Sequence, residues 1–209
     1  LINKFKPNII VCTHAFPCTS ISKLKTEIPL IYVITDFDIL SYHLRTGADI
    51  ILVPNKEIKD KMNFLKKKLL ITGIPIDHEF SRTKNKSILL KQYGLKERST
   101  LLILGGGAGI GYFEKIIKLV NHDFQIIACV GNNTVLKKRL HKKFPNIMIF
   151  GYTKNIDEIY RLANIAITKP GGLTSSELLA IGLPIIITNP LPGIEQKNAI
   201  YLTSKNVAI

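Results

Sequence analysis

The sequence predicts an α/β fold built from two doubly wound parallel sheets. Short apolar segments rich in β-branched residues alternate with amphipathic stretches along the whole chain, which is the pattern of parallel strands joined by crossover helices. The chain has 209 residues, of which 46% are hydrophobic. It is therefore long enough and apolar enough for one large or two small domains.

The first domain is expected to contain four parallel strands. They are predicted at residues 9–13, 30–34, 50–53 and 69–72. A helix is expected between the last two, over residues 55–67, because Asn55 is a suitable N-cap and apolar residues follow it at helical spacing. Residues 73–77 hold a glycine and a proline and break the alternation. We therefore expect two domains, residues 1–78 and residues 79–209.

The alternation restarts in the second domain and continues to the end of the chain. Strands are predicted at residues 101–104, 124–130, 147–150, 165–168 and 185–188, and helices at residues 87–93, 112–121, 134–143, 156–164 and 195–204, with one more that begins at Thr174. The first domain begins between elements and has only four strands. We therefore expect the N-terminal lobe to be incomplete.

Residues 165–177 form the most informative motif of the chain. A β-branched strand leads into a Pro-Gly-Gly turn, and a helix is expected to begin at Thr174. Because Gly171 and Gly172 have no Cβ, backbone N–H groups at the start of this helix can face a ligand, and this arrangement binds anions. Thr174 and Glu177 have the spacing of a capping box. We expect a bound phosphate at the carboxyl end of this strand.

A second glycine-rich loop lies between a predicted strand and a predicted helix. It has five glycines within residues 105–111, but their spacing fits neither G-x-G-x-x-G nor a P-loop. The next strand ends at Val130 without the acidic residue that a nicotinamide dinucleotide requires. A tight crossing of the chain needs only one or two glycines, so their number favours close approach of a ligand.

Composition restricts the classes of partner. The net charge of +14 and the pI of about 9.7 favour anionic partners, although lysine clusters such as residues 137–143 are more often solvated helix faces. Aromatic residues make up 8% of the chain and form no stacking ladder, which argues against nucleic acid. The three cysteines lack the spacing of a disulfide framework or a zinc site, and no apolar run approaches the roughly 20 residues of a membrane span. A cytoplasmic protein without a metal site is expected.

Polar side chains at the ends of the first two strands are candidate catalytic groups. His14 follows the first strand, and Asp36 and Asp38 follow the second, so they are expected at the same edge of the sheet. A histidine beside a carboxylate is a general-base arrangement. The alternatives are a solvated loop histidine and an aspartate that caps the next segment.

Two further loops follow strands of the second domain. Tyr152 and Thr153 offer an aromatic ring and exposed backbone that suit a planar base, although a capped turn is the simpler interpretation. Residues 189–198 bring Glu195 and amide side chains to the start of a helix, and such groups suit sugar hydroxyls. A preference of the helix dipole for acidic residues also explains Glu195.

Seven motifs occur in order along the chain: THAFPC at 13–18, VITDFD at 33–38, TGIPID at 72–77, LGGGAGIG at 104–111, GYTKN at 151–155, TKPGGLTSSE at 168–177 and NPLPGIEQKNA at 189–199. In these motifs the sequence resembles the monogalactosyldiacylglycerol synthases and processive diacylglycerol glucosyltransferases, which are inverting B-type glycosyltransferases related to the peptidoglycan N-acetylglucosaminyltransferase. The resemblance implies two Rossmann-like lobes of GT-B type. It also implies a UDP-sugar held mainly by the C-terminal lobe, a lipid acceptor that approaches through the N-terminal lobe, and no metal or redox cofactor.

The resemblance further implies roles for individual residues. His14 and Asp36 are candidates for the base, although the glycine-rich segment in which the family has a histidine proposed as base would precede residue 1. The donor-binding residues would be Gly171, Gly172 and Thr174 at the diphosphate, Glu177 at the ribose hydroxyls, Tyr152 and Thr153 at the uracil, Gly107 and Gly109 in the loop facing the donor, and Glu195, Gln196 and Asn198 near the sugar or ribose.

The expected function is transfer of a hexose from a UDP-sugar to a lipid hydroxyl, foremost that of diacylglycerol. The protein is expected to associate peripherally with an anionic membrane surface in the cytoplasm, because its positive charge favours such a surface. Two positions depart from the family pattern: Ala15 stands where relatives tend to have proline, and Gln196 replaces a commonly acidic residue. A polyprenyl-linked or polysaccharide acceptor is an alternative, as is a non-catalytic relative that binds UDP-sugar or membrane.

Overall fold

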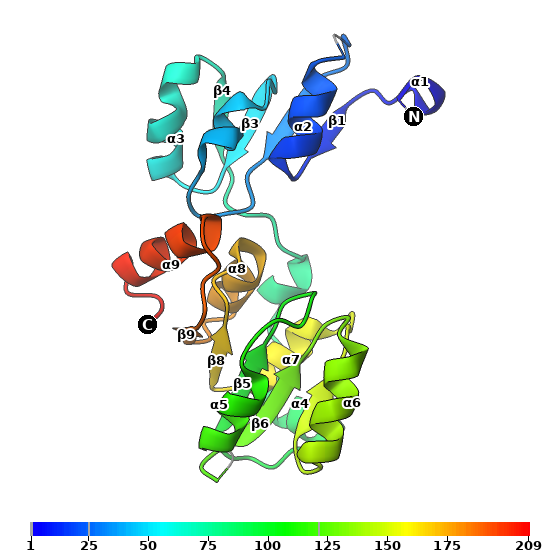
Figure 1. Cartoon of the computed structure of the whole chain (residues 1–209), viewed down its shortest axis with the longest axis vertical. Coiled ribbons are helices and arrows are strands. Elements are labelled where there is room, and N and C mark those ends of the chain that lie inside the picture. Colours follow the sequence, from blue (N-terminus) through cyan, green and yellow to red (C-terminus); the bar gives the residue numbers. More distant parts are fainter. Residues whose placement is uncertain (1, 25, 121) are drawn as a thin grey trace. The chain divides into compact units, whose positions relative to one another are not determined.

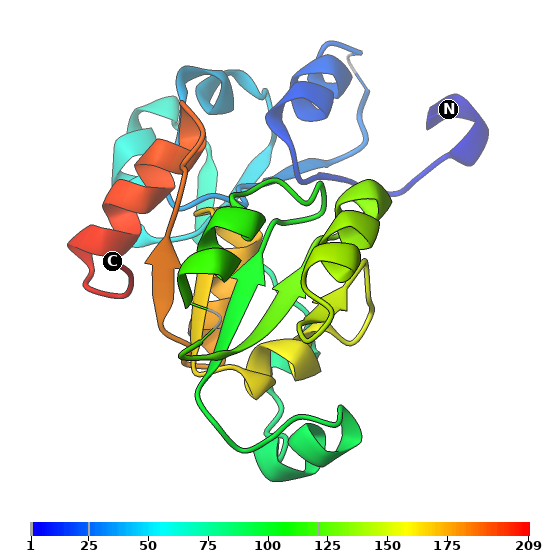
Figure 2. The same ribbon diagram turned by 60° about the horizontal axis from the view of Figure 1, so that its bottom comes forward.

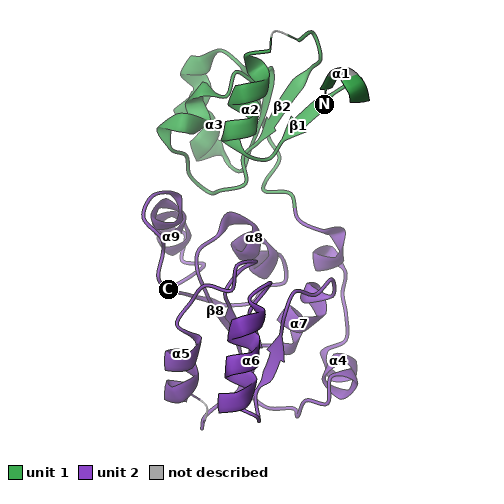
Figure 3. Ribbon diagram, turned by 45° about the vertical axis from the view of Figure 1, so that its right-hand side comes forward, with its two compact units in different colours: residues 1–75 green, residues 76–209 purple. Residues whose placement is uncertain are grey.

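The computed structural model describes residues 2–24, 26–120 and 122–209 (Figures 1 and 2). The chain divides into two compact units, Leu1–Pro75 and Ile76–Ile209 (Figure 3). The boundary near residue 78 that the sequence predicts lies three residues further along the chain. Each unit has its own parallel sheet, so the prediction of an α/β fold with two parallel sheets is confirmed.

The first unit contains a four-stranded parallel sheet. Its elements are α1 (Ile2–Phe5), β1 (Ile10–Cys12), α2 (Ala15–Ser22), β2 (Leu30–Val33), the 3-10 helix η1 (Ser41–Arg45), β3 (Ile50–Val53), α3 (Lys56–Met62), the 3-10 helix η2 (Asn63–Leu65) and β4 (Lys68–Ile71). The strands lie in the order β1-β2-β3-β4, and Cys12 of β1 aligns with Tyr32 of β2. The segments that follow β1 and β2 therefore leave the sheet at the same edge.

Two helix starts in this unit have local causes. The side chain of Asn55 accepts a hydrogen bond from the Ile58 N–H (2.8 Å), so Asn55 is the N-cap of α3, as predicted. The helix α2 was not predicted. His14 is its N-cap and accepts from the Phe16 N–H through Nδ1 (3.3 Å), and Pro17 is tolerated because the first turn of a helix needs no N–H donor there.

The second unit contains a five-stranded parallel sheet. Its elements are the 3-10 helix η3 (His78–Ser81), α4 (Lys86–Gln92), β5 (Thr100–Leu104), α5 (Phe113–Val120), β6 (Gln125–Cys129), α6 (Thr134–Lys143), β7 (Met148–Phe150), α7 (Ile156–Leu162), β8 (Ile165–Thr168), α8 (Gly172–Ala180), β9 (Ile185–Ile187) and α9 (Ile194–Ser204). The strand order is β7-β6-β5-β8-β9. Helices α5 and α6 lie on one face of the sheet, and α7 and α8 lie on the other (Figures 1 and 2), so the sheet is doubly wound.

The interior of the described residues is mainly apolar and contains three thiols. Cys12, Cys18 and Cys129 are buried and free. Burial raises the pKa of Cys18 and of Cys129 to about 12, so both thiols stay protonated at neutral pH. None of the helices in the described part of the chain is long and apolar enough to cross a membrane.

Candidate functional site

The strand order of the second unit reverses between β5 and β8, which pair with each other in parallel. Residues Leu104 and Thr168 are aligned at the carboxyl ends of these two strands. The glycine-rich loop 105–111 follows one strand, and the Pro-Gly-Gly turn follows the other. Open α/β sheets bind ligands at such a switch point, so the two predicted glycine motifs meet where a ligand is expected.

A cavity of about 220 Å³ opens at this switch point. It contains five of the predicted donor-binding residues, namely Gly107, Tyr152, Thr153, Thr174 and Glu177. The remaining lining residues are Leu104, Gly106, Cys129, Gly131, Gly151, Ile156, Tyr160 and Leu173. The lining therefore combines apolar side chains with exposed backbone, the aromatic rings of Tyr152 and Tyr160 and one carboxylate, which is the composition of a small-molecule site.

The helix α8 begins at Gly172, two residues before the predicted start. Its N-cap is Gly171, which makes no side-chain hydrogen bond to the helix. The predicted capping box of Thr174 and Glu177 is therefore wrong, because Thr174 already lies inside the first turn. An added Cβ on Gly171 would meet no described atom within 4 Å. Leu173 and Thr174 of this first turn line the cavity, whereas Gly171 and Gly172 do not; the start of a helix is a potential anion site.

Glu177 lies at the edge of the cavity, on the turn of α8 that follows Thr174. The hydroxyl of Tyr160 on α7 donates to its Oε2 (3.2 Å). Burial raises the pKa of Glu177 to about 7; the hydrogen bond from Tyr160 acts in the opposite direction, and the charge of Asp77 adds to the rise. Burial also raises the pKa of Tyr160 above its usual range, so Tyr160 remains a donor to Glu177.

The glycines of loop 105–111 serve two purposes. Gly109 has φ +63°, and a Cβ there would overlap the Val130 carbonyl oxygen, so the fold itself requires this glycine. Gly109 is not among the residues that line the cavity. Gly107 does line it, and an added Cβ there would meet no described atom within 4 Å. The close packing of the loop against the Val130 backbone explains the glycine at position 109. Close approach of a ligand remains the better interpretation of the glycine at position 107.

The three predicted residues of α9 are not in the cavity lining and instead hold the neighbouring turns. Glu195 pairs with Lys169 (2.8 Å) and accepts from the Leu191 N–H (2.8 Å). The buried Asn198 donates to the Pro170 carbonyl (3.0 Å). The Oε1 of Gln196 accepts from the Gly193 N–H (3.4 Å). Glu195 and Asn198 therefore support the Pro-Gly-Gly turn from behind.

Two residues of the second unit were missed from the sequence. Tyr160 lines the cavity and anchors Glu177, and Lys169 places an ammonium group directly before the Pro-Gly-Gly turn. The position of Lys169 between strand and turn was a usable signal, because a cation beside an anion site is favourable. The sequence gives no such signal for Tyr160, because its partner Glu177 lies in another helix.

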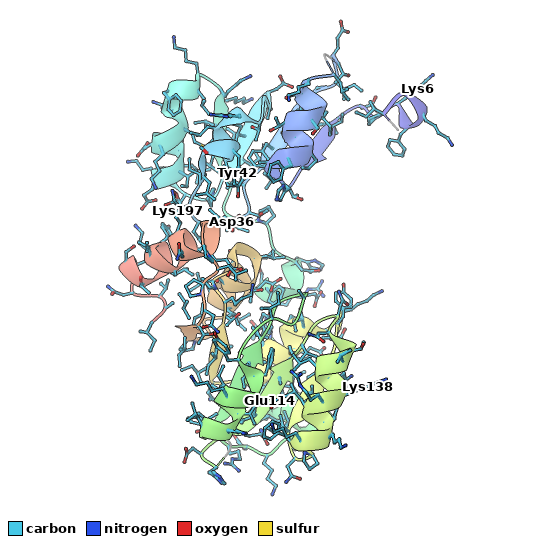
Figure 4. All side chains as sticks on the ribbon, viewed as in Figure 1. Lys6, Asp36, Tyr42, Glu114, Lys138 and Lys197 are labelled. Carbon is cyan, nitrogen blue, oxygen red and sulfur yellow. The ribbon has the colours of Figure 1, made fainter. Side chains whose placement is uncertain are left out.

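The two candidate catalytic residues lie in the first unit. The ring of His14 stacks on Phe16 with 5.2 Å between centroids, and its Nδ1 is the cap acceptor of α2. Asp36 lies beside Tyr42 (Figure 4); burial and the Asp36 charge raise the pKa of Tyr42. Asp38 pairs with Lys61 (2.8 Å). Within the described residues, no group of three or more His, Cys, Asp or Glu side chains is arranged to hold a metal ion.

Solved structures share this architecture. MurG from Acinetobacter baumannii matches with a TM-score of 0.62 and 17% identity over 99% of this chain and 60% of that one. Phytolacca americana UGT2, complexed with UDP-2fluoro-glucose and pterostilbene, matches with a TM-score of 0.64 and 12% identity over 100% and 62%. Anabaena Alr3699/HepE in complex with UDP matches with a TM-score of 0.57 and 12% identity over 96% and 70%. The fold is that of the GT-B glycosyltransferases.

Sequence comparison narrows the class to a family. The profile of the glycosyltransferase family 28 C-terminal domain matches residues 100–209, and that of monogalactosyldiacylglycerol (MGDG) synthase matches residues 1–76. The processive diacylglycerol beta-glucosyltransferases of Bacillus cytotoxicus and Bacillus cereus are each 33% identical over 100% of this chain and 57% of their own length. The chain belongs to glycosyltransferase family 28, in its MGDG synthase group, and spans little more than half the length of these relatives. The predicted family is confirmed.

Proposed function

We propose that this protein is an inverting transferase that moves a hexose from a UDP-sugar to a lipid hydroxyl, with diacylglycerol as the acceptor. The observation that carries the proposal is the uncapped start of α8 beside the cavity at the switch point, because it offers amides to a diphosphate and adjoining space to a nucleoside. Two relatives are named for glucosyl transfer to diacylglycerol. The Anabaena structure with a similar fold contains UDP.

The donor is assigned to the second unit. The diphosphate lies against the amides that follow Gly171, and the ribose hydroxyls donate to Glu177. The uracil lies beside Tyr152 and Thr153, in the part of the cavity with the apolar floor. Loop 105–111 covers the donor, with Gly107 as its point of closest approach. Glu195, Gln196 and Asn198 keep the turns around the sugar in place.

The reaction is a single displacement. The acceptor oxygen forms a bond to the anomeric carbon while the bond from that carbon to the diphosphate oxygen breaks, and the configuration inverts. Negative charge grows on the departing UDP, and the amides at Gly172 and Thr174 stabilise it. The acceptor proton passes to a base, for which Asp36 and His14 are the candidates in this chain. Asp36 is the stronger candidate, because the helix cap occupies the Nδ1 lone pair of His14 and leaves its proton on Nε2.

Calorimetric titration of the 209-residue chain with UDP tests the donor site. Glu177→Ala is expected to weaken UDP binding about tenfold, because hydrogen bonds to a charged group contribute about 1.5 kcal/mol. Glu114→Ala is the control, since Glu114 lies on α5 outside the cavity and pairs with Arg139 and Lys143. Equal UDP affinity in Glu177→Ala and the parent chain, or no binding by the folded parent, contradicts the assignment.

We assign the membrane contact to the basic surface of α6. This helix carries five basic residues and no acidic one: Lys137, Lys138, Arg139, Lys142 and Lys143. Its Val135 and the Leu119 of the neighbouring α5 are exposed apolar side chains. Figure 4 shows Lys138 on α6 and Glu114 on α5. Lysines over exposed apolar groups suit an anionic lipid surface.

Vesicle flotation tests this surface. The chain is expected to float with vesicles that contain anionic lipid at low salt, and to lose binding at high salt. Reversal of Lys137, Lys138 and Lys142 to Glu is expected to reduce partitioning more than tenfold, at about 1 kcal/mol for each charge. Reversal of Lys56, Lys59 and Lys61 on α3 changes the net charge equally and is the control. Equal losses in the two variants would show that net charge alone acts.

A further inference from the structure

Tyr160 of α7 is part of the wall of the cavity at the switch point. Its side chain is buried, with 4% of the residue exposed, and its ring packs against Phe80 of η3 with 5.7 Å between the ring centroids. Packing on this scale restricts the rotation of an aromatic side chain. The hydroxyl of Tyr160 is therefore held at a defined point of the wall.

Two side chains of α8 meet this hydroxyl. Helices α7 and α8 lie on the same face of the sheet (Figures 1 and 2). The Tyr160 hydroxyl donates to Oε2 of Glu177 (3.2 Å), and the side chain of Thr174 is hydrogen-bonded to the same phenol. Thr174 and Glu177 also line the cavity. The three side chains thus form one connected network, with Tyr160 in the middle.

The two oxygens of the Glu177 carboxylate have different surroundings. Oε2 accepts from Tyr160, whereas no residue in the part of the chain that the structure describes donates a hydrogen bond to Oε1. A carboxylate oxygen has two lone pairs and accepts up to two hydrogen bonds. Since Tyr160 holds one end of the carboxylate, the other end is presented to donors of a ligand in the cavity.

The charge of Glu177 depends on the groups around it. Burial raises the pKa of Glu177 to about 7, and the hydrogen bond from Tyr160 lowers it. The charge of Asp77, the N-cap of η3, also raises the pKa of Glu177. Cys129 of β6 lies near Tyr160, and burial keeps its thiol protonated. Among these groups, Tyr160 is the one that favours the carboxylate form of Glu177.

We propose that Tyr160 is a positioning residue of the donor site, whose hydroxyl holds Oε2 of Glu177 and keeps this side chain an acceptor for the ribose hydroxyls of the donor. Tyr160 acts through Glu177 and takes no part in the transfer itself. The inference rests on the proposed function and extends it, because it makes UDP affinity depend on a residue of α7 and on pH. UDP affinity should increase as the pH rises through about 7, since Glu177 then loses its proton to solvent.

Calorimetric titration with UDP at pH 7 and pH 9 tests the proposal on the 209-residue chain and on Tyr160→Phe. Phenylalanine keeps the ring that packs against Phe80 and removes the hydroxyl. The midpoint of a carbon-13 titration of Glu177 should move upward by about one pH unit, because the carboxylate loses a hydrogen bond. With a protonated Glu177 that binds UDP about tenfold more weakly, UDP affinity should be about threefold lower than in the parent at pH 7 and within about 1.5-fold of it at pH 9. The titration of UDP itself cancels in this ratio.

Tyr93→Phe is the matched control, because the Tyr93 hydroxyl donates to Oε2 of Glu158 (2.8 Å) in the same unit and neither residue lines the cavity. This variant should keep the parental UDP affinity at both pH values. The parent chain provides a second measurement that needs no variant: saturating UDP should lower the midpoint of the Glu177 titration by about one pH unit, which corresponds to the tenfold difference in affinity. Circular dichroism and thermal unfolding verify that each variant is folded.

The outcomes separate positioning from a structural role. A loss of UDP affinity in Tyr160→Phe that is equal at pH 7 and pH 9 would overturn the proposal, as would unchanged affinity at pH 7 or an equal loss in Tyr93→Phe. An unchanged Glu177 midpoint in the parent with bound UDP would also overturn it. A parent chain that binds UDP while any of these results is found refutes this inference alone, whereas a folded parent that binds no UDP refutes the proposed function.

Discussion

The raised pKa of Glu177 predicts a specific dependence of stability on pH. A carboxyl group whose pKa is raised by folding favours the folded state while it is protonated. Its contribution is complete below the unfolded value near 4.5 and is lost as the pH rises through about 7. Glu177→Gln removes this titration but keeps a carbonyl oxygen that accepts from Tyr160. The variant should therefore become more stable relative to the parent chain as the pH increases.

The magnitude follows from the size of the shift. A rise from 4.5 to about 7 corresponds to about 3 kcal/mol at 1.36 kcal/mol per unit. Glu177 is only half-buried, and solvent screens part of this cost, so we expect about 1.5 kcal/mol. The difference in unfolding free energy between Glu177→Gln and the parent should be near zero at pH 4.5 and reach about 1.5 kcal/mol at pH 8.

Native-state hydrogen exchange is the suitable assay, because it reports the second unit separately through the amides of β5 and β8. Other titrating groups cancel in the difference between parent and variant. Glu114→Gln is the control. Lys143 and Arg139 lower the pKa of Glu114, so the stabilisation that Glu114 provides is lost only at acidic pH. The difference in unfolding free energy between Glu114→Gln and the parent should therefore be flat between pH 6 and 8. A flat difference for Glu177→Gln between pH 4.5 and 7 would refute the reasoning, as would a carbon-13 titration of Glu177 with a midpoint near 4.5.

Three further predictions concern the glycine loop, the Pro-Gly-Gly turn and an ion pair of α7. Gly109→Ala should lower the free energy of unfolding by about 2 kcal/mol or more, because the added Cβ would overlap Val130. Gly107→Val should leave the stability measured by thermal unfolding within about 0.5 kcal/mol of the parent, but it should weaken UDP binding in calorimetry. Asn198→Ala should cost about 1–3 kcal/mol in urea unfolding, because the buried Pro170 carbonyl loses its donor; Ser204→Ala on the exposed end of α9 is its control. Asp157→Ala should cost about 1 kcal/mol, because Lys84 loses its shortest ion pair, at 2.6 Å, but keeps Glu79 and Glu158. Equal stability of this variant and the parent would show that the pair contributes nothing.

Most of the fold was predictable because apolar periodicity is a local property. The bounds of α6 and β3 match the predicted residues 134–143 and 50–53. The helix α2 was missed because it has no amphipathic pattern. Only Ala15 and Cys18 are buried in it, and Pro17 suggests a loop when the sequence is considered alone.

The site was only partly predictable because some of its interactions join residues that are distant in the sequence. The two glycine motifs were visible, since a turn followed by a helix is encoded locally. The spacing of Thr174 and Glu177 was misleading, because residues three apart share a face anywhere in a helix. The contacts from Tyr160 to Glu177 and from Asn198 to Pro170 span 17 and 28 residues. Such contacts form only when the sheet and its helices have assembled.

The distant contacts occupy the polar side chains around the proposed anion site. A helix start normally recruits a nearby carboxylate, hydroxyl or amide to satisfy its first amides. Around α8 these groups are committed elsewhere: Glu177 accepts from Tyr160, Glu195 pairs with Lys169, and Asn198 donates to Pro170. The cap itself is Gly171, which has no side chain to offer. Under the proposed function an anionic ligand binds at the first amides of α8, and the arrangement depends on the supporting residues as much as on the glycines.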